Sequence, residues 1–515
     1  MASLKHLVLL TSLLGHAASA TTAVNIPGLG IIVGNVRPGC YEYLGIKYAT
    51  ASRFEEPKPV RPWPNPYNAT SRGPMCFQKC PAVPRLVCQD KVSEDCLFLN
   101  IFTPTGAPSD RCVMVFVHGG SFTSYSGGSQ LYDGEKFVQK GGCILVTINY
   151  RLAAFGFLGS RNLGLRDQMK ALEWIHRNIQ YFGGNTGKIT VFGQSAGAQS
   201  TALLMSIPSA SQYFDQAIIQ SSPFTLPFRT AAQSDSQEAQ LATLMGCVKG
   251  NLKCYQEADA DDILALQDEV ELPEASFLMS FEFWGPVIDD SLVKDHLYNI
   301  FARGLHKKMN IIIGTVRDET LGYAFSLSAS PLSKQQLEEL LRMISPKLSL
   351  ELLSPFYDID GNDDKRFVLA EMSTDYLFRC VSQAVANIVS KNAVVYSYAF
   401  DQEFHVDIWG EGNICNDYAC HGMELPMVFG TYGLWNYTLT SDEMNLSDDL
   451  IQYWNNFARD GSPSNQNSSL HMWSSFKTWQ QKFLLLQAGG TEMQSDPSTS
   501  IKCSLLEQFL GFNPI

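Results

Sequence analysis

The chain has 515 residues, of which 45% are hydrophobic, so it is long enough to bury a large core. Its 51 acidic and 38 basic residues give a formal net charge of −13, which argues against nucleic-acid and anionic-membrane partners because both require a basic surface. Acidity on this scale favours solubility and names no substrate.

The first twenty residues have the pattern of a cleaved secretory signal. Lys5 and His6 precede an apolar run at 7–14, and Ala18-Ser19-Ala20 offers a small-x-small cleavage site. The run is shorter than the ~20 residues that span a bilayer, so export is favoured over a membrane anchor. We predict that residues 1–20 are removed, that 21–515 form one domain, and that the protein is secreted without integral membrane association.

Apolar, β-branched runs alternate with helical patterns along the rest of the chain. This alternation predicts an α/β protein with a large, mostly parallel sheet covered by helices on both faces. Residues 24–60, rich in Gly and Pro, predict an antiparallel flap at the sheet edge, and 165–179 predict a helix with Met169, Leu172 and Ile175 on one face. The expected strands are 112–118, 144–149, 189–192, 216–220, 310–314 and 394–400.

A glycine-rich turn follows the first of these strands. It reads His118-Gly119-Gly120-Ser121-Phe122. Backbone amides in such a turn can bind a developing oxyanion, and the alternative is an ordinary structural turn. A nucleophile nearby would favour the first interpretation.

Residues 193–197, Gly-Gln-Ser-Ala-Gly, have the Gly-x-Ser-x-Gly form of a nucleophile elbow. Roughly 0.2 such matches are expected by chance in a chain of this length, so the pentapeptide alone is weak. Its position between the strand 189–192 and a helical run at 198–205 strengthens it. We therefore predict Ser195 as a nucleophile, with Gly193 and Gly197 letting the backbone pass and the Ala196 amide beside the reacting carbonyl.

A nucleophilic serine needs a histidine as base and a carboxylate that orients the histidine. Along an α/β-hydrolase chain the order is serine, then the carboxylate, then the histidine. Asp318 and Glu319 come soon after the strand 310–314, and either carboxylate could orient an imidazole. Beyond them only His405, His421 and His471 remain. His421 begins a loop next to a glycine, whereas the other two fit ordinary polar positions, so elimination favours His421.

The cysteines and glycosylation triplets agree with export. Thirteen cysteines predict several disulfides and at least one free thiol, and the close pairs Cys247/Cys254 and Cys415/Cys420 could close small loops. Cys143 lies in an apolar run and is expected to be a buried thiol. The absence of Cys-x-x-Cys spacing argues against zinc, and no metal is expected. The Asn-x-Ser/Thr acceptors are Asn68, Asn436, Asn445 and Asn467.

Two segments are similar to signatures of the type-B carboxylesterase family, which includes cholinesterases and fungal lipases. Residues 93–100, Ser-Glu-Asp-Cys-Leu-Phe-Leu-Asn, resemble its second signature, and 191–198, Val-Phe-Gly-Gln-Ser-Ala-Gly-Ala, resemble its active-serine signature. Lesser landmarks follow in the family's order over nearly the whole mature chain, at 43–49, 149–152, 164–168 and 453–458. The resemblance points to a secreted fungal member.

This resemblance implies an α/β-hydrolase fold and a serine esterase without cofactor that acts on a small-molecule ester. The implied catalytic residues are Ser195, Glu319 and His421, with Ser221 supporting them and the amides of Gly120, Ser121 and Ala196 forming the oxyanion hole. It also implies the disulfides Cys76–Cys96 and Cys247–Cys254 and a buried ion pair between Glu94 and Arg151.

Three departures from the family pattern bear on function. Gln194 precedes the serine where Glu is common, Thr320 follows Glu319 where Gly is common, and the loop between Cys76 and Cys96 is short. That loop also holds Cys80 and Cys88, which could bond to each other. A short loop favours an esterase of small or medium carboxylic esters over a lipase of long-chain acylglycerols.

Other interpretations remain open at this point. The chain could be an acyltransferase, or a non-catalytic cholinesterase-like adhesion protein. Phe122, Phe283 and Trp284 could line a substrate pocket, although aromatic core packing is the favoured explanation for each of them.

Overall fold

A computed structural model gives the fold of most of the chain. It describes residues 20–63, 66–80, 87–106, 109–272, 276–344, 349–361, 363–405, 413–435, 437–464 and 469–512. The expected signal segment, apart from residue 20, and the acceptors Asn436 and Asn467 lie outside these ranges. Asn68 and Asn445 lie within them, and both are exposed.

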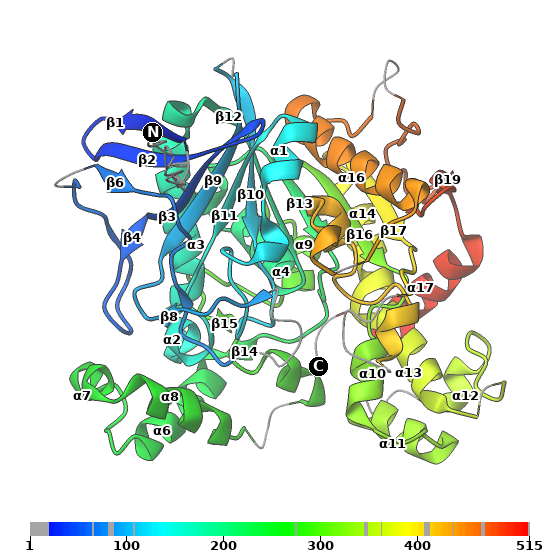
Figure 1. Cartoon of the computed structure of the whole chain (residues 1–515). Helices are drawn as coiled ribbons and strands as arrows, with labels where there is room; N and C mark the ends of the chain where they lie inside the picture. The colour runs from blue at the N-terminus through cyan, green and yellow to red at the C-terminus, as the bar shows by residue number, and fades with distance from the viewer. Residues whose placement is uncertain are drawn as a thin grey trace, which may run out of the picture.

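One 13-stranded sheet runs through the molecule (Figure 1). Its central strands β11, β10, β12, β13, β16, β17 and β18 are parallel to one another in that order. The strands of the main path are β1 (Thr21–Ile26), β2 (Gly30–Arg37), β3 (Cys40–Lys47), β9 (Phe98–Pro104), β11 (Ile144–Ile148), β10 (Arg111–Val117), β12 (Gly184–Gln194), β13 (Gln216–Gln220), β16 (Asn310–Val316), β17 (Val395–Phe400), β18 (Phe483–Leu486) and β19 (Glu492–Gln494).

The sequence pattern explains why these strands are central. β11 is buried throughout and β10 is buried from its second residue onward, as continuous apolar runs require in a parallel sheet covered on both faces. The six expected strands are β10, β11, β12, β13, β16 and β17, and the largest difference is that β12 begins at Gly184. β1, β2 and β3 pair antiparallel at one edge, as expected for the flap.

Helices cover both faces of the sheet (Figure 1). α1, α15 and α16 pack together on one face, whereas α4, α9 and α14 pack on the other. Their bounds are α1 (Glu135–Gly141), α3 (Leu163–Asn178), α4 (Ala196–Ser206), α9 (Leu297–Ala302), α14 (Cys380–Val389), α15 (Leu425–Phe429) and α16 (Ser441–Asp460). α3 is the helix expected at 165–179.

Two further groups of helices lie below the sheet in the view of Figure 1. The first contains α6 (Ala231–Leu244), α7 (Leu252–Glu257) and α8 (Ala260–Leu266). The second contains α10 (Leu321–Leu327), α11 (Lys334–Ile344), α12 (Leu350–Leu353) and α13 (Lys365–Thr374), with α17 (Pro497–Leu510) beside it. The short helix η6 (Phe277–Glu282) belongs to the segment that joins the two groups, and the π-helical turn η7 (Asp375–Arg379) follows α13.

Six disulfides cross-link the chain. They are Cys76–Cys96, Cys80–Cys88, Cys112–Cys143, Cys247–Cys254, Cys380–Cys503 and Cys415–Cys420. Cys40 is a free, buried thiol. The expectation that Cys143 is a thiol is therefore wrong. β10 and β11 are parallel neighbours, and their register brings the Cα atoms of Cys112 and Cys143 to 4.8 Å, which suits a disulfide.

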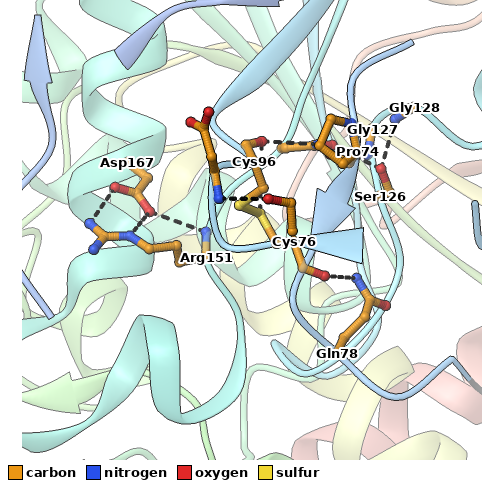
Figure 2. The surroundings of a disulfide bond; sticks show 12 residues. Pro74, Cys76, Gln78, Cys96, Ser126, Gly127, Gly128, Arg151 and Asp167 are labelled. Carbon is orange, nitrogen blue, oxygen red and sulfur yellow. Dashed lines mark hydrogen bonds and ion pairs between the residues drawn. A yellow bond between two sulfur atoms is a disulfide. The ribbon is translucent and has the colours of Figure 1, made fainter. Parts of the chain in front are cut away.

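The surroundings of the Cys76–Cys96 disulfide correct a second expectation (Figure 2). Arg151 pairs with Asp167, not with Glu94, through bonds of 2.7 Å from Nε and from Nη2, and both side chains are almost fully buried. Glu94 is partly exposed and instead accepts from the Nε of Arg53 at 2.6 Å. The buried ion pair exists, but the acid comes from α3, which packs directly against the turn that holds Arg151.

Candidate active site

Four connections from the sheet converge at the carboxyl ends of its parallel strands. The glycine-rich turn follows β10, Ser195 follows β12, and Glu319 lies just beyond β16. The connection after β17 supplies His421. In an open α/β sheet this edge is where ligands bind, because the carboxyl ends of parallel strands meet there. Ser121, Ser195 and His421 line one cavity at this edge.

Ser195 sits on a sharp turn between β12 and α4. Its backbone has φ 59° and ψ −129°, a conformation that a non-glycine residue adopts only when its surroundings enforce it. A Cβ atom on Gly193 would lie 2.3 Å from the Gly197 carbonyl oxygen, and one on Gly197 would lie 2.0 Å from that of Val117. The turn therefore depends on both glycines, and it leaves Ser195 partly accessible from the cavity.

A carboxylate holds the imidazole of His421 in position. Its Nδ1 lies 2.5 Å from Glu319 Oε2, and the backbone amide of Val316 donates to Glu319 Oε1 at 2.9 Å. Glu319 is fully buried, whereas the His421 side chain is 13% exposed. The N–H at Nδ1 thus donates to a fixed acceptor, which leaves Nε2 as the nitrogen that faces the cavity.

The two carboxylates that the sequence left undecided have different partners. Asp318 accepts from Arg317 Nε at 2.8 Å and from the Ala419 amide at 3.2 Å. Of these two carboxylates, only Glu319 contacts the imidazole of His421. Thr320, which stands where Gly is common, donates its hydroxyl to the Ala370 carbonyl at 2.7 Å and so ties the start of α10 to α13.

Gln194 contacts the second ring nitrogen of His421. Its Nε2 lies 3.0 Å from His421 Nε2, and the amide N–H donates to the unprotonated ring nitrogen. Within the described residues the Ser195 hydroxyl makes no hydrogen bond to His421. Catalytic hydrogen bonds are often formed only in the substrate complex, so the serine must replace this amide at Nε2 when substrate binds.

The glycine-rich turn lies directly against the elbow. A Cβ atom on Gly119 would be 2.7 Å from the Gln194 carbonyl oxygen and 3.0 Å from Ser195 Cβ. Gly120 has φ +95° and Ser121 has φ 52°, so the backbone turns sharply here and its amides are free of strand pairing. His118 supports the turn from below: burial lowers its pKa to about 4, and the neutral ring donates to the Gly119 carbonyl at 2.9 Å.

The cavity that Ser195 lines is mostly apolar, and it holds about 1120 Å³ of space in all, part of which is open solvent. Most of its lining comes from η6, the second helical group, η7 and α17. The apolar and aromatic lining residues are Pro223, Leu226, Phe277, Leu278, Phe281, Tyr323, Ala324, Leu327, Leu340, Leu341, Ile344, Leu353, Tyr357, Leu369, Met372, Tyr376, Leu377, Phe378 and Leu506. Phe122, Phe283 and Trp284 are not among the described lining residues. Phe122 packs on Phe157, and Phe283 and Trp284 pack on each other, so core packing explains them.

Two buried carboxyl groups near the site were missed by the sequence reasoning. Burial raises the pKa of Glu424 to about 7, helped by the charge on Glu319, and Gln220 donates to it at 3.1 Å. Burial likewise raises the pKa of Glu282, a cavity residue, to about 8. The signal available for Glu282 was an acidic residue inside the aromatic run 277–284.

Ser221, expected to support the site, is fully buried one residue after β13. Its amide donates to the Gly314 carbonyl at 2.8 Å, and its hydroxyl makes no hydrogen bond within the described residues. In the part of the chain that the structure describes, no cluster of three or more His, Cys, Asp or Glu side chains could hold a metal ion. None of the described helices is long and apolar enough to cross a bilayer.

Comparison with known proteins gives matches that cover most of the chain. The model of the carboxylesterase family matches residues 20–503. The cAMP-regulated D2 protein of Dictyostelium discoideum is 32% identical over 96% of this chain and 94% of its own length. The para-nitrobenzyl esterase of Bacillus subtilis is 31% identical over 91% of this chain and 96% of its own length. The cholinesterase of Mus musculus is 30% identical over 88% and 80%.

Proposed function

The chain belongs to the carboxylesterase family and is a type-B carboxylesterase, and from this premise we propose that it cleaves esters with Ser195 as nucleophile, His421 as base and Glu319 as the acid that orients the base. The observation that carries the proposal is the 2.5 Å contact between His421 Nδ1 and Glu319 Oε2 at the cavity that Ser195 lines.

The proposed reaction begins with proton transfer. As Ser195 Oγ forms a bond to the ester carbonyl carbon, its proton moves to Nε2 of His421, and Glu319 stabilises the resulting imidazolium through Nδ1–H. His421 then gives the proton to the departing alkoxide, which leaves as an alcohol. Water, deprotonated by the same Nε2, attacks the acyl-enzyme. The bond between the acyl carbon and Ser195 Oγ then breaks, His421 returns the proton to Oγ, and the carboxylic acid leaves.

The developing oxyanion is assigned to the amides of Gly120, Ser121 and Ala196. The first two belong to the turn that lies against the elbow, and the third begins α4, where the positive end of the helix dipole adds to the amide. Loss of one such donor is expected to lower turnover by about 10²–10³-fold.

Small or medium esters are the proposed substrates. The loop between Cys76 and Cys96 carries a second disulfide, Cys80–Cys88, which limits how far it can move as a lid. The apolar lining of the cavity suits a hydrocarbon chain. An esterase of this kind should follow simple saturation with a short triglyceride, whereas a jump in rate once an emulsion forms would favour a lipase.

Turnover of a panel of chromogenic aryl, short-acyl and long-acyl esters tests the catalytic assignment. Ser195→Ala should lower kcat by at least about 10⁴-fold, because the members of such a triad act as a unit. A Ser195→Ala protein that retains activity would overturn the assignment, and a wild-type protein inactive on every ester would favour a non-catalytic role. Partition of the acyl group between water and added alcohols tests acyl transfer in the same assay.

We also propose that residues 1–20 are a signal removed on export and that 21–515 fold as one domain. The six disulfides and the exposed acceptors Asn68 and Asn445 support an oxidising, extracellular location. N-terminal sequencing of protein recovered from the culture medium should begin at Thr21.

A further inference from the structure

One acidic side chain stands in the otherwise apolar part of the cavity. Glu282 ends η6, and the other three residues of η6 that line the cavity are Phe277, Leu278 and Phe281. Glu282 is only 5% exposed. Burying a carboxyl group is costly unless it is fully hydrogen-bonded, so its presence here needs a reason.

The Glu282 carboxyl group is held in place by the protein, but only part of its hydrogen-bonding capacity is occupied. Gln199 Nε2 donates to Glu282 Oε2 at 3.0 Å and also to the Pro223 carbonyl at 3.3 Å. Within the described residues Glu282 forms no ion pair, and no donor reaches its Oε1. A carboxyl group has room for several hydrogen bonds, so one oxygen remains free for a ligand.

Its position is close to the nucleophile. Gln199 lies four residues after Ser195 on α4, a rise of about 6 Å along the helix. Glu282, Ser121, Ser195 and His421 all line the same cavity. A chain attached to the reacting carbonyl therefore enters the cavity that the Glu282 carboxyl lines.

Three other polar groups of the lining already bond to the protein. Thr320 donates to Ala370, Ser373 donates to the Leu369 carbonyl at 2.6 Å, and Tyr357 donates to Asp375 at 3.0 Å. The hydroxyls of Tyr323 and Tyr376 also line the cavity without a hydrogen bond among the described residues, but both side chains are less buried than Glu282. Glu282 is thus the most deeply buried of the lining groups that can still bond a substrate.

We propose that Glu282 is a specificity-determining residue that binds a hydroxyl group on the chain of the ester that enters the cavity. This inference rests on the proposed ester hydrolysis and names its substrate class, the hydroxy-substituted carboxylic esters. A hydroxyl group both donates and accepts, so it matches a carboxyl group in either protonation state.

The electrostatic surroundings favour a neutral ligand over a cation. The titratable groups that sense the charge of Glu282 are Tyr150, at the end of β11, and Tyr323, on α10, and the pKa of each is raised partly by that charge. On α11, which packs against η6, Glu338 and Arg342 pair with each other at the surface. Burial raises the pKa of the Glu282 carboxyl to about 8, so the group is neutral at neutral pH. A ligand ammonium group would therefore have to drive the ionisation of this carboxyl inside an apolar site.

A matched ester series tests the proposal. The probes are para-nitrophenyl hexanoate, a set of its analogues with one hydroxyl group at successive carbons, and the 6-amino analogue. For wild-type protein, kcat/KM at the best hydroxyl position should exceed that of plain hexanoate by about 10- to 100-fold, the range expected for a buried hydrogen bond to substrate. E282L should reduce this ratio to about one or less, whereas E282Q, which keeps the hydrogen-bonding capacity, should retain most of it.

The ratio of kcat/KM for the hydroxylated and the plain ester distinguishes a role of Glu282 in specificity from a structural or a catalytic role. A merely structural Glu282 would lower turnover of both esters together and leave their ratio unchanged in E282L, and that result would overturn the proposal. A preference for the amino analogue would overturn it as well. If E282L does not fold, calorimetric titration of the series into S195A decides, because equal affinity for plain and hydroxylated esters contradicts the proposal. Failure of the proposed hydrolysis is distinct, since it would appear as wild-type protein that turns over no ester.

Discussion

Gln194 offers a direct test of how the site handles charge. The residue before the nucleophile places its amide nitrogen 3.0 Å from Nε2 of His421 and is itself 5% exposed. Replacing it by Glu puts a carboxylate against the imidazole on the side where the serine proton must be accepted. A carboxylate there stabilises the protonated ring, which cannot act as a base.

The size of the effect follows from the geometry. Two unit charges 3.0 Å apart interact by about 5.5 kcal/mol at an effective dielectric constant of about 20. The cost of burying the new carboxylate offsets much of this energy. The acid limb, the part of the profile where kcat/KM falls as the pH is lowered, should therefore shift to a pH about 1 to 3 units higher. At a pH below the wild-type limb, activity should fall by about 10-fold for each unit of that shift.

The assay is a kcat/KM profile with para-nitrophenyl acetate from pH 4.5 to 9. Gln194→Met is the matched control, because it removes the amide but adds no charge, and it should leave the acid limb within about half a unit of wild type. Near pH 9 all three proteins should agree within several-fold. An acid limb that stays in place in Gln194→Glu would refute the assignment of His421 as the base and of Gln194 as its neighbour.

Three other predictions follow from the structure. Glu319→Gln should lower kcat by about 10³–10⁴-fold, whereas Asp318→Asn should cost less than about 10-fold, because only the first contacts His421; equal losses in a steady-state assay would contradict this division. Titration of the denatured, unreduced protein should find one thiol per chain, and three thiols would mean that the Cys112–Cys143 disulfide is absent. The double variant Cys112→Ala/Cys143→Ala should lose about 3–4 kcal/mol of unfolding free energy in urea, since that disulfide closes a loop of 31 residues. Burial raises the pKa of Glu282 from 4.5 to about 8, so between these two pH values the folded chain keeps a proton that the unfolded chain has lost. The stability of the wild-type protein relative to Glu282→Gln should therefore fall as the pH rises through this window. A difference in urea midpoint that does not change with pH would count against the shifted pKa.

The strands and the elbow could be predicted because their signals are local. A buried parallel strand is a continuous apolar run, and the six expected strands are present in the central sheet. The turn at Ser195 depends on Gly193 and Gly197, and these glycines are visible in the sequence itself. Periodicity likewise located α3 within two residues at its N-terminus.

What could not be predicted depends on contacts between distant segments. An apolar context around Cys143 fits a buried thiol and a buried disulfide equally well, and only the register of β10 against β11 decides. The partner of Arg151 depends on how α3 packs, not on the spacing to Glu94. Asp318 and Glu319 are adjacent in sequence, and the direction in which each side chain points separates them.

The cavity was the hardest feature to anticipate. Its lining joins η6 to helices from 321 to 374 and to α17, segments separated by up to some two hundred residues, so no local pattern announces it. Individual aromatic residues were poor guides, since Phe122 and Trp284 pack in the core while Phe281 and Phe378 line the cavity.

The central claim is that Ser195 is the nucleophile of an acyl-transfer site, and covalent labelling tests it most directly. A fluorophosphonate probe should modify the wild-type protein at one position, and mass spectrometry should place the adduct on the peptide that contains Ser195. Ser195→Ala should take up no label, while Ser221→Ala, whose hydroxyl is fully buried, should still be labelled at Ser195. An adduct on another residue, or labelling that persists in Ser195→Ala, would contradict the account.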